Sequence, residues 1–151
     1  MKLRKNITGF ADLADKQSKV ELKEIKSAIF SIEITKAYKI SEIKEPGQSS
    51  NYFTVTLTDL RTNDTMGILI NGQYPCYCGV TGDSSWMNLK FTELPLAVRN
   101  CMDKKFKYLT PTELYFTVER NDLKELSESE LRQINYWKSK TLGEIIFNGY
   151  D

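Results

Sequence analysis

Residues 52–59 read Tyr-Phe-Thr-Val-Thr-Leu-Thr-Asp, so that apolar side chains alternate with threonines along the segment. Successive side chains of a β-strand point to opposite faces of its sheet. The alternation therefore predicts a strand with Phe53, Val55 and Leu57 on a buried face and the threonines on a polar face. A sheet of this kind needs cover on its apolar side only.

The same alternation recurs further along the chain, at 66–70, 87–91 and 114–118. We expect each of these segments to form another half-buried strand. Pro46-Gly47 predicts a turn before the threonine-rich strand at 52–59. The polar stretch 59–65 after it is short enough to form a hairpin. Short connections favour antiparallel pairing of the strands they join.

Helical spacing precedes these strands. Leu22, Ile25 and Ile29 recur at intervals of three and four residues, which predicts a short helix. The pattern then changes to alternation over 30–34, and we expect the helix to run into a strand there. Pro95 follows a predicted strand and is typical of the first turn of another short helix.

A capping box marks the start of a helix at Ser127. In such a box the serine accepts the backbone N–H of the third helical residue, here Glu130, and the glutamate binds back to the serine N–H. Leu131, Ile134 and Trp137 follow along one side of this helix, and we expect them to help close the core.

Thr141 and Glu144 repeat the capping-box spacing closer to the C-terminus, and Gly149 suits the end of the helix that they begin. The alternative for 144–147 is a closing strand, because Ile-Ile-Phe also favours sheets.

Together these elements predict an α+β fold. We expect a single domain over residues 1–151, with an antiparallel sheet of about five strands, two to four short helices covering one face, and C-terminal helices closing the core. Residues 1–19 are polar and weakly periodic, and we expect the least order there.

The composition excludes several classes of active site. The 151 residues include 21 Lys and Arg, 20 Asp and Glu, and no histidine. Histidine is the usual general base near neutral pH and the commonest metal ligand, so Ser-His-Asp and Cys-His machinery and His-based metal sites are excluded. Carboxylate pairs, Ser-Lys dyads and carboxylate-bound magnesium stay open.

The three cysteines, Cys76, Cys78 and Cys101, are expected to be reduced and mostly buried. An odd count does not make a closed disulfide framework. One residue separates Cys76 from Cys78, whereas zinc ribbons place two to four residues between their thiols. We predict no metal site and no cofactor.

A net charge of +1 argues against a nucleic-acid-binding surface. No run of eighteen apolar residues is present, so no membrane partner is expected. The basic start at 1–5 is followed by no apolar stretch, so we expect no secretory leader and a cytoplasmic location. The sequence leaves the oligomeric state open.

The irregular stretch 74–86 supplies the first candidate partner-binding residues, Tyr74, Tyr77 and Trp86. Exposed aromatic side chains on loops are common anchors in protein interfaces. The alternative is that this loop folds over a sheet edge and buries its rings. Ser84 has no evident base beside it in the sequence, so a nucleophilic role is not expected.

Residues 119–130 supply the second candidate set, because five acidic and two basic residues give this segment a local net charge of −3. The candidates for docking a charged partner are Glu119, Asp122, Glu125 and Glu128. Glu113, Glu119 and Asp122 would form a paired-carboxylate site if the fold brought them into one cleft. The alternative for the whole segment is a solvated face.

A resemblance concerns residues 136–151. This tail resembles the C-terminal tail of small bacterial immunity-type proteins that occur beside polymorphic toxins. The matching positions are Trp137, Lys138, Thr141, Gly143, Glu144, Phe147, Asn148 and Asp151. The resemblance implies a cytosolic, non-catalytic protein that neutralises a cognate toxin by occluding it, and no catalytic residue transfers with it.

Two other classes of function compete with this hypothesis. One is an enzyme that uses carboxylates, with or without magnesium. The other is a small-ligand-binding module or a structural subunit of a larger assembly. The hypothesis we favour is a protein-binding protein whose acidic segment suits a toxin with a basic active site.

Overall fold

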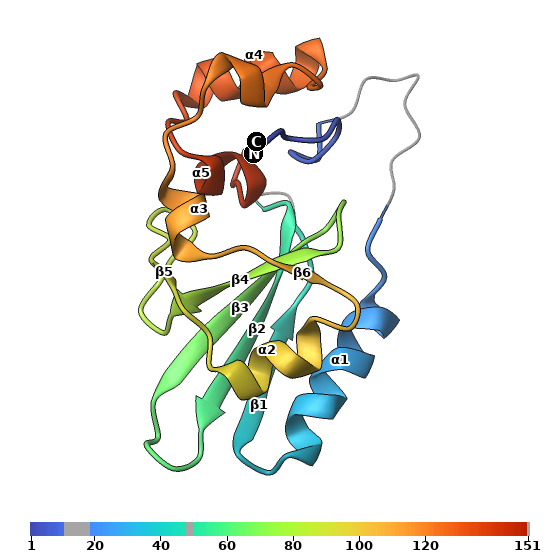
Figure 1. Cartoon of the computed structure of the whole chain (residues 1–151), viewed down its shortest axis with the longest axis vertical. Coiled ribbons are helices and arrows are strands. Elements are labelled where there is room, and N and C mark those ends of the chain that lie inside the picture. The colour runs from blue at the N-terminus through green and yellow to red at the C-terminus, as the bar shows by residue number, and fades with distance from the viewer. Residues whose placement is uncertain (11–18, 48–49, 151) are drawn as a thin grey trace.

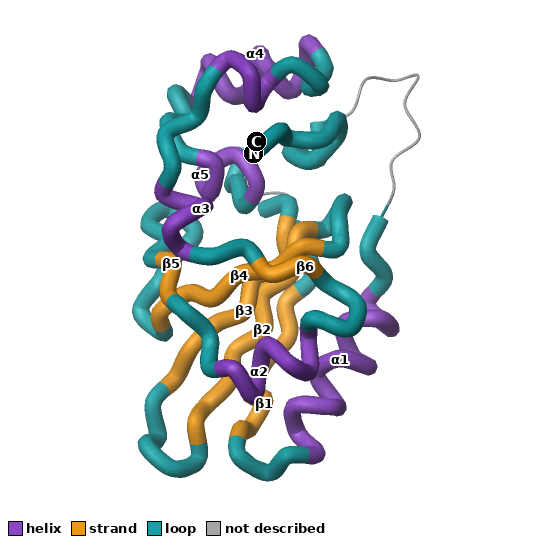
Figure 2. Tube along the Cα trace, viewed as in Figure 1, coloured by secondary structure: helices purple, strands orange, loops and turns teal. Residues whose placement is uncertain are grey.

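A six-stranded sheet forms the framework of the molecule (Figures 1 and 2). The computed structural model describes residues 1–10, 19–47 and 50–150. Five strands follow one another across the sheet in chain order: β1 (Tyr38–Lys44), β2 (Tyr52–Asp59), β3 (Thr65–Asn71), β4 (Cys76–Thr81) and β5 (Phe91–Thr92). Neighbours in this order are antiparallel, and the short β6 (Lys107–Tyr108) pairs with β4 in parallel. The fold is α+β, as predicted.

Two helices cover one face of the sheet, α1 (Leu22–Ile34) and α2 (Leu96–Met102) (Figure 1). Their apolar sides pack with the strands into one cluster of buried residues, which includes Ile29, Phe53, Val55, Ile68 and Val98. We call this cluster the helical core.

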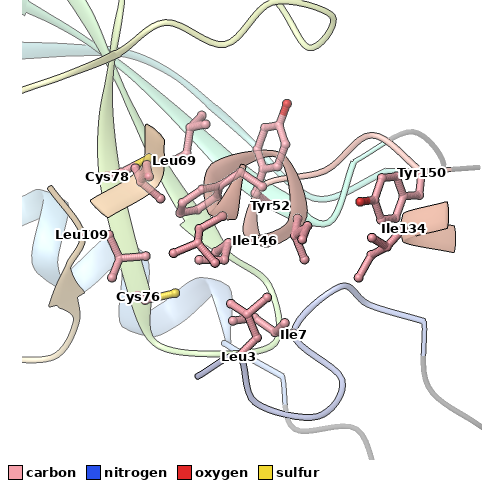
Figure 3. Close-up of a cluster of buried hydrophobic side chains, with 14 of the residues drawn as sticks. Leu3, Ile7, Tyr52, Leu69, Cys76, Cys78, Leu109, Ile134, Ile146 and Tyr150 are labelled. Atoms are coloured by element: carbon pink, nitrogen blue, oxygen red, sulfur yellow. The ribbon is translucent and has the colours of Figure 1, made fainter. Parts of the chain in front are cut away.

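The remaining helices gather at one end of the sheet, beside residues 1–10 (Figure 1). They are α3 (Pro111–Tyr115), the 3-10 helix η1 (Arg120–Leu123), α4 (Glu128–Trp137) and α5 (Leu142–Ile146). A second cluster of buried residues joins both chain ends to the sheet, and Leu3, Ile7, Cys78 and Ile146 belong to it (Figure 3). We call this cluster the terminal core. In the described part of the chain, no helix has both the length and the apolar content that crossing a membrane requires.

The two cores lie on opposite faces of the central strands. Along β3, Ile68 and Ile70 belong to the helical core, whereas Leu69 between them belongs to the terminal core. Along β4, Tyr77 belongs to the helical core and its neighbour Cys78 to the terminal core. Helices α1 and α2 thus form the predicted cover of one face, and the C-terminal helices close a core on the other face of the middle strands.

Strand β4 corrects a second expectation, since 76–79 belongs to a stretch predicted to be irregular. All residues of 76–80 are buried. A strand covered on both faces loses the alternation of apolar and polar residues, so periodicity gives no sign of it.

Residues 30–34 continue helix α1 and do not form the predicted strand. The buried residues of the helix follow a three-to-four spacing through Ile32. Phe30 and Ile34 are 62% and 61% exposed, whereas Ile32 between them is buried. The alternation of apolar residues at 30, 32 and 34 therefore does not mark one buried face. The strand comes later, as β1, after Lys36 in the left-handed conformation at φ 57°.

Two other predicted strands are largely wrong. Of 87–91, Phe91 alone enters a strand, and Met87 is 78% exposed. Residues 114–118 overlap helix α3, which begins because Thr110 and Glu113 form a capping box in front of Pro111 at the first helical position.

The locally encoded features are confirmed. The hairpin of β2 and β3 forms around the polar stretch 59–65. Ser127 Oγ accepts the backbone N–H of Glu130 at 3.3 Å, and the Glu130 carboxylate accepts the Ser127 N–H at 2.9 Å. Thr141 and Glu144 cap α5 in the same way, so the alternative strand at 144–147 is not formed.

Residues 1–10 are better packed than expected. Leu3 and Ile7 are 1% and 7% exposed in the terminal core. The carboxylate of Glu130 accepts the backbone N–H groups of Asn6 and Thr8 at 3.0 and 3.2 Å. The capping glutamate of α4 therefore also anchors the first ten residues. The stretch expected to be poorly ordered continues to Lys19, and its residues 11–18 lie outside the described residues.

Candidate functional site

A pocket of about 450 Å³ borders the terminal core. Segments far apart in the sequence line it: the loop 82–90, β5, α3, the end of α4 and the C-terminal residues 147–150. Six aromatic rings contribute to its wall, those of Trp86, Phe91, Tyr115, Trp137, Phe147 and Tyr150. We call it the aromatic pocket.

The rings of the pocket pack against one another in pairs. Phe91 and Tyr115 meet edge to face with their centroids 5.4 Å apart. Trp137 and Tyr150 are nearly parallel with centroids 6.1 Å apart. Aromatic pairs prefer such offset or edge-to-face arrangements, so these contacts hold the orientation of the wall.

Large apolar side chains remain exposed around this pocket. Trp86, Met87, Tyr115 and Trp137 are 57%, 78%, 52% and 41% exposed. Single exposed apolar residues are common on proteins, but several around one concave site are typical of a binding surface.

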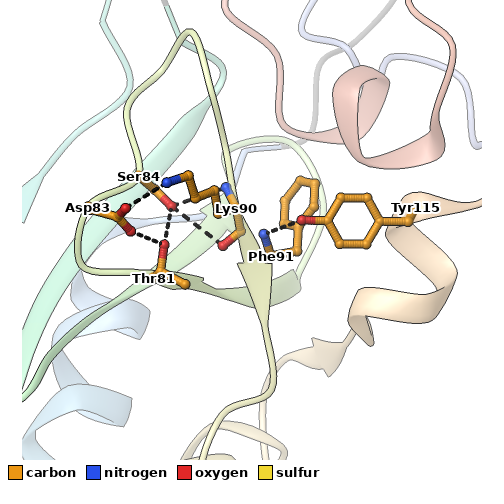
Figure 4. Close-up of polar contacts among 6 residues, drawn as sticks. All are labelled: Thr81, Asp83, Ser84, Lys90, Phe91 and Tyr115. Atoms are coloured by element: carbon orange, nitrogen blue, oxygen red, sulfur yellow. Dashed lines mark hydrogen bonds and ion pairs between the residues drawn. The ribbon is translucent and has the colours of Figure 1, made fainter.

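The loop 82–90 is held in place by polar contacts at its base (Figure 4). Lys90 Nζ lies 2.6 Å from the Asp83 carboxylate, and the Lys90 N–H donates to Ser84 Oγ at 3.1 Å. Thr81 Oγ1 donates a further hydrogen bond to Asp83. The hydrogen bonds from the Lys90 ammonium and then the Thr81 hydroxyl, together with the Lys90 charge, lower the pKa of Asp83 to about 2. Ser84 therefore helps to shape the loop that presents Trp86.

Tyr115 joins α3 to the edge of the sheet. Its hydroxyl accepts the backbone N–H of Phe91 at 3.0 Å (Figure 4). Gly143 in α5 packs directly below, and a Cβ at that position would lie 2.4 Å from the Phe91 ring. Glycine is therefore required at 143 for the ring of Phe91 to form the pocket wall.

Three buried asparagines fix the C-terminal residues that form the floor. The Asn71 amide donates to the carbonyls of Ile7 and Ile146 at 3.0 and 2.7 Å. Asn51 donates to the same two carbonyls, and Asn148 donates to those of Thr8 and Ile145. The side-chain amides of Asn51, just before β2, and Asn71, in β3, thus hold backbone carbonyls from both chain ends.

The described residues that line the pocket have no net formal charge. Lys138 and Glu144 are the two charged residues among them. Tyr150 shares a hydrogen bond with Ser139, and burial raises the pKa of the Tyr150 phenol to about 12. The phenol is therefore neutral near pH 7.

Of the three predicted aromatic anchors, Trp86 is exposed and lines the aromatic pocket. Tyr77 is fully buried in the helical core, where its hydroxyl bonds to Asp103, and its prediction as a partner-binding residue is wrong. Tyr74 is half-buried and donates to the carbonyl of Lys5, so that it secures residues 1–10. Tyr77 is buried because it lies within β4, which is covered on both faces, whereas Tyr74 precedes that strand and packs against residues 1–10.

The predicted acidic surface is smaller than the sequence indicates. Asp122 is 9% exposed and accepts the Glu119 N–H at 2.9 Å, so the prediction that it meets a partner is wrong. Glu119, Glu125 and Glu128 are exposed, and none of them lines the aromatic pocket.

A second pocket also has a volume of about 450 Å³. The fold brings Glu113, Glu119 and Asp122 together in its lining. The carboxylates of Glu113 and Asp122 accept backbone N–H groups at the starts of α3 and η1. Within the described ranges, no group of three or more Cys, Asp and Glu residues is placed to hold a metal ion.

The three cysteines are free, and two are unsuited to nucleophilic chemistry. Burial raises the pKa of Cys76 to about 12 and holds that of Cys78 well above its usual range. Because the thiolate is the reactive species, both thiols are inert at neutral pH in the folded protein. Cys101 on α2 is half-buried.

Comparison with protein-family models, curated proteins and solved structures finds no match for this chain. Several residues of the C-terminal tail that carries the resemblance have structural roles in this fold. Lys138 ends α4 in the left-handed conformation at φ 54°, and Thr141 and Glu144 cap α5. Asn148 ties the floor of the pocket to β2, and Asp151 lies outside the described residues.

Sequence reasoning missed Met87, Tyr115 and Trp137 as surface residues. Met87 and Tyr115 fell in segments predicted to be strands, and Trp137 was assigned to the core. The helical period gave one signal for Trp137. Residues three apart are rotated by about 60° from one another around a helix axis, so Trp137 does not lie on the same side of α4 as Leu131.

Proposed function

We propose that the protein binds another protein over the aromatic pocket, and that it serves as a cytoplasmic immunity protein that occludes a cognate bacterial toxin. The observation that carries this proposal is the group of exposed side chains around the pocket, Trp86, Met87, Tyr115 and Trp137. Tryptophan, tyrosine and methionine are enriched in the buried centres of protein interfaces, where a few aromatic anchors supply most of the binding energy.

The fixed base of the loop 82–90 supports the same proposal. Its contacts between Asp83, Ser84 and Lys90 form without a partner. A loop that is already ordered loses less conformational freedom on binding, so more of the contact energy remains as affinity. Trp86 is thereby presented on a preorganised support.

The exposed carboxylates add a second component. Glu119, Glu125 and Glu128 lie on the segment before and at the start of α4 and would attract a partner with a basic surface. Exposed charges of this kind act mainly on the rate of association and on its salt dependence. Occlusion of a toxin requires no catalytic residue, and the resemblance of the C-terminal tail points to the same class of function.

A pull-down from the cells that naturally produce the protein tests the proposal. The tagged protein is purified at low and at high salt, and co-eluting proteins are identified by mass spectrometry. We expect a near-stoichiometric partner with a toxin-like domain, retained better at low salt. Background proteins alone at both salt concentrations, with no binding by the product of the neighbouring reading frame, would refute the proposal.

The enzyme alternative has a separate test. If the carboxylates around the second pocket bound magnesium, millimolar Mg²⁺ would raise the midpoint of thermal unfolding, because a ligand of the native state stabilises it. We expect no such shift, since Glu113 and Asp122 are already engaged by backbone N–H groups.

A further inference from the structure

We infer that the aromatic pocket receives one neutral aromatic side chain, a tyrosine or tryptophan, from the partner protein. This inference rests on the proposed function and specifies the anchor that the partner contributes.

The size and wall suit a ring. The volume of about 450 Å³ holds one large aromatic side chain together with part of the backbone that bears it. The edge-to-face pair of Phe91 and Tyr115 and the parallel pair of Trp137 and Tyr150 offer both faces and edges for further aromatic contacts. Each such contact adds stabilisation beyond the buried area alone.

The charge of the lining favours a neutral occupant. Lys138 and Glu144 carry opposite charges, and the other described residues that line the pocket are uncharged. A cationic side chain would gain from the aromatic rings and from Glu144 but would be repelled by Lys138. An acidic side chain would be attracted by Lys138 but repelled by Glu144. Neither ion finds a lining of opposite net charge, whereas a neutral ring has no such conflict.

Polar groups in the lining favour an aromatic side chain that carries a hydrogen-bonding group over a purely aliphatic one. The hydroxyls of Ser139 and Tyr150 and the side-chain amide of Asn88 belong to the lining. A tyrosine O–H or a tryptophan N–H can bond to such groups while its ring stays on the apolar wall. A leucine offers no partner for Asn88 or for the further hydrogen bond that the paired Ser139 and Tyr150 hydroxyls can still make.

The chain offers a direct spectroscopic probe, because both of its tryptophans, Trp86 and Trp137, line this pocket. A ¹⁵N-labelled sample therefore gives two indole N–H signals, both from the pocket wall. The variants Trp86→Phe and Trp137→Phe assign them. The probe ligand is N-acetyl-L-tyrosinamide, with N-acetyl-L-leucinamide and N-acetyl-L-argininamide as matched controls.

We expect tyrosinamide to shift both indole signals in a saturable way, with a Kd on the order of 1 mM. The leucine and arginine amides should bind at least threefold more weakly, which corresponds to at least about 0.6 kcal/mol. Trp137→Ala should weaken tyrosinamide binding, followed through the Trp86 signal. Phe30→Ala should not, because Phe30 is 62% exposed on α1 and does not line the pocket.

Indole signals that stay unshifted, or that shift equally with all three amides, would overturn the inference. A stronger response to the arginine amide would also overturn it and assign a cationic anchor instead. The titration uses the free protein, so its failure leaves a partner found by pull-down in place. Conversely, absence of a partner in the pull-down would refute the proposed function whatever the titration shows.

Discussion

The two faces of the sheet are stabilised by different chemistry. The helical core joins α1 and α2 to the strands through apolar side chains such as Ile29, Val55 and Ile68. The terminal core also has an apolar interior, but buried polar groups of Asn71, Asn148 and others bind the backbones of both chain ends to the sheet.

This difference determines how each core responds to change. An apolar contact loses stability in proportion to the volume removed, whereas a buried polar group that loses its partner leaves unsatisfied donors or acceptors at a high cost. Because the aromatic pocket is built on the terminal core, its shape depends on a few hydrogen bonds. Substitutions in the two cores should therefore differ in their effects.

Replacing Glu130 should have the largest effect. Its carboxylate accepts the N–H groups of Asn6, Thr8 and Ser127 in a fully buried site. Glu130→Ala leaves these donors unpaired and should reduce the free energy of unfolding by roughly 3–5 kcal/mol. Urea denaturation measures the loss. Glu128→Ala, at an exposed position in the same helical turn, is the matched control and should change stability by less than about 0.5 kcal/mol. Similar losses for the two variants would contradict the anchoring role.

Replacing Asn148 should loosen the terminal core selectively. Asn148→Ala removes the bonds to the carbonyls of Thr8 and Ile145 and should cost about 2–3 kcal/mol. Hydrogen exchange should accelerate in residues 1–10 and 142–150 more than in the β2–β3 hairpin. Asn135→Ala on the exposed side of α4 is the control. Uniform acceleration across both cores would show that they do not respond separately.

Adding one methyl group to Gly143 should disturb the pocket wall. The new Cβ would lie 2.4 Å from the Phe91 ring, so Gly143→Ala should destabilise the protein by about 1–3 kcal/mol through overpacking. It should also move the indole signal of Trp137. Gly47→Ala meets no atom within 4 Å and should leave both stability and spectrum nearly unchanged. An unaffected Gly143→Ala variant would mean that the wall adapts freely.

Thiol reactivity gives the smallest effect, since it leaves the fold intact. Burial raises the pKa of Cys76 to about 12 and that of Cys78 well above its usual range. A thiol reagent at pH 8 should therefore modify the half-buried Cys101 first, because a raised pKa leaves almost no thiolate at the other two. Mass spectrometry of labelled peptides checks this order. Labelling of Cys76 or Cys78 in native protein as fast as Cys101 would disprove it.

The predictable parts of the fold are those that neighbouring residues encode. The β2–β3 hairpin follows from one-sided alternation, and the starts of α4 and α5 follow from their capping boxes. Strand β4 could not be predicted because burial on both faces removes its period. Residues 30–34 were misassigned because Ile32 fits both a helical and an alternating pattern.

The candidate site was harder to predict than the fold. Trp86 stands out because it follows a turn-forming stretch with few apolar neighbours. Tyr115 and Trp137 reach the same pocket from α3 and α4, and that proximity depends on how the terminal core packs. Asp122 seemed available for a partner because its engagement by the Glu119 N–H depends on a short 3-10 helix that the charge pattern does not indicate.

The most direct test of the account compares three tagged proteins in parallel pull-downs: the wild type, the Trp86→Ala/Trp137→Ala double variant, and Phe30→Ala. Circular dichroism first verifies that all three are folded. If a partner docks on the aromatic pocket, the wild type and Phe30→Ala should retain the same near-stoichiometric toxin-like protein, and the double variant should lose most of it. Equal retention by all three proteins, or no such partner on any of them, would contradict the account.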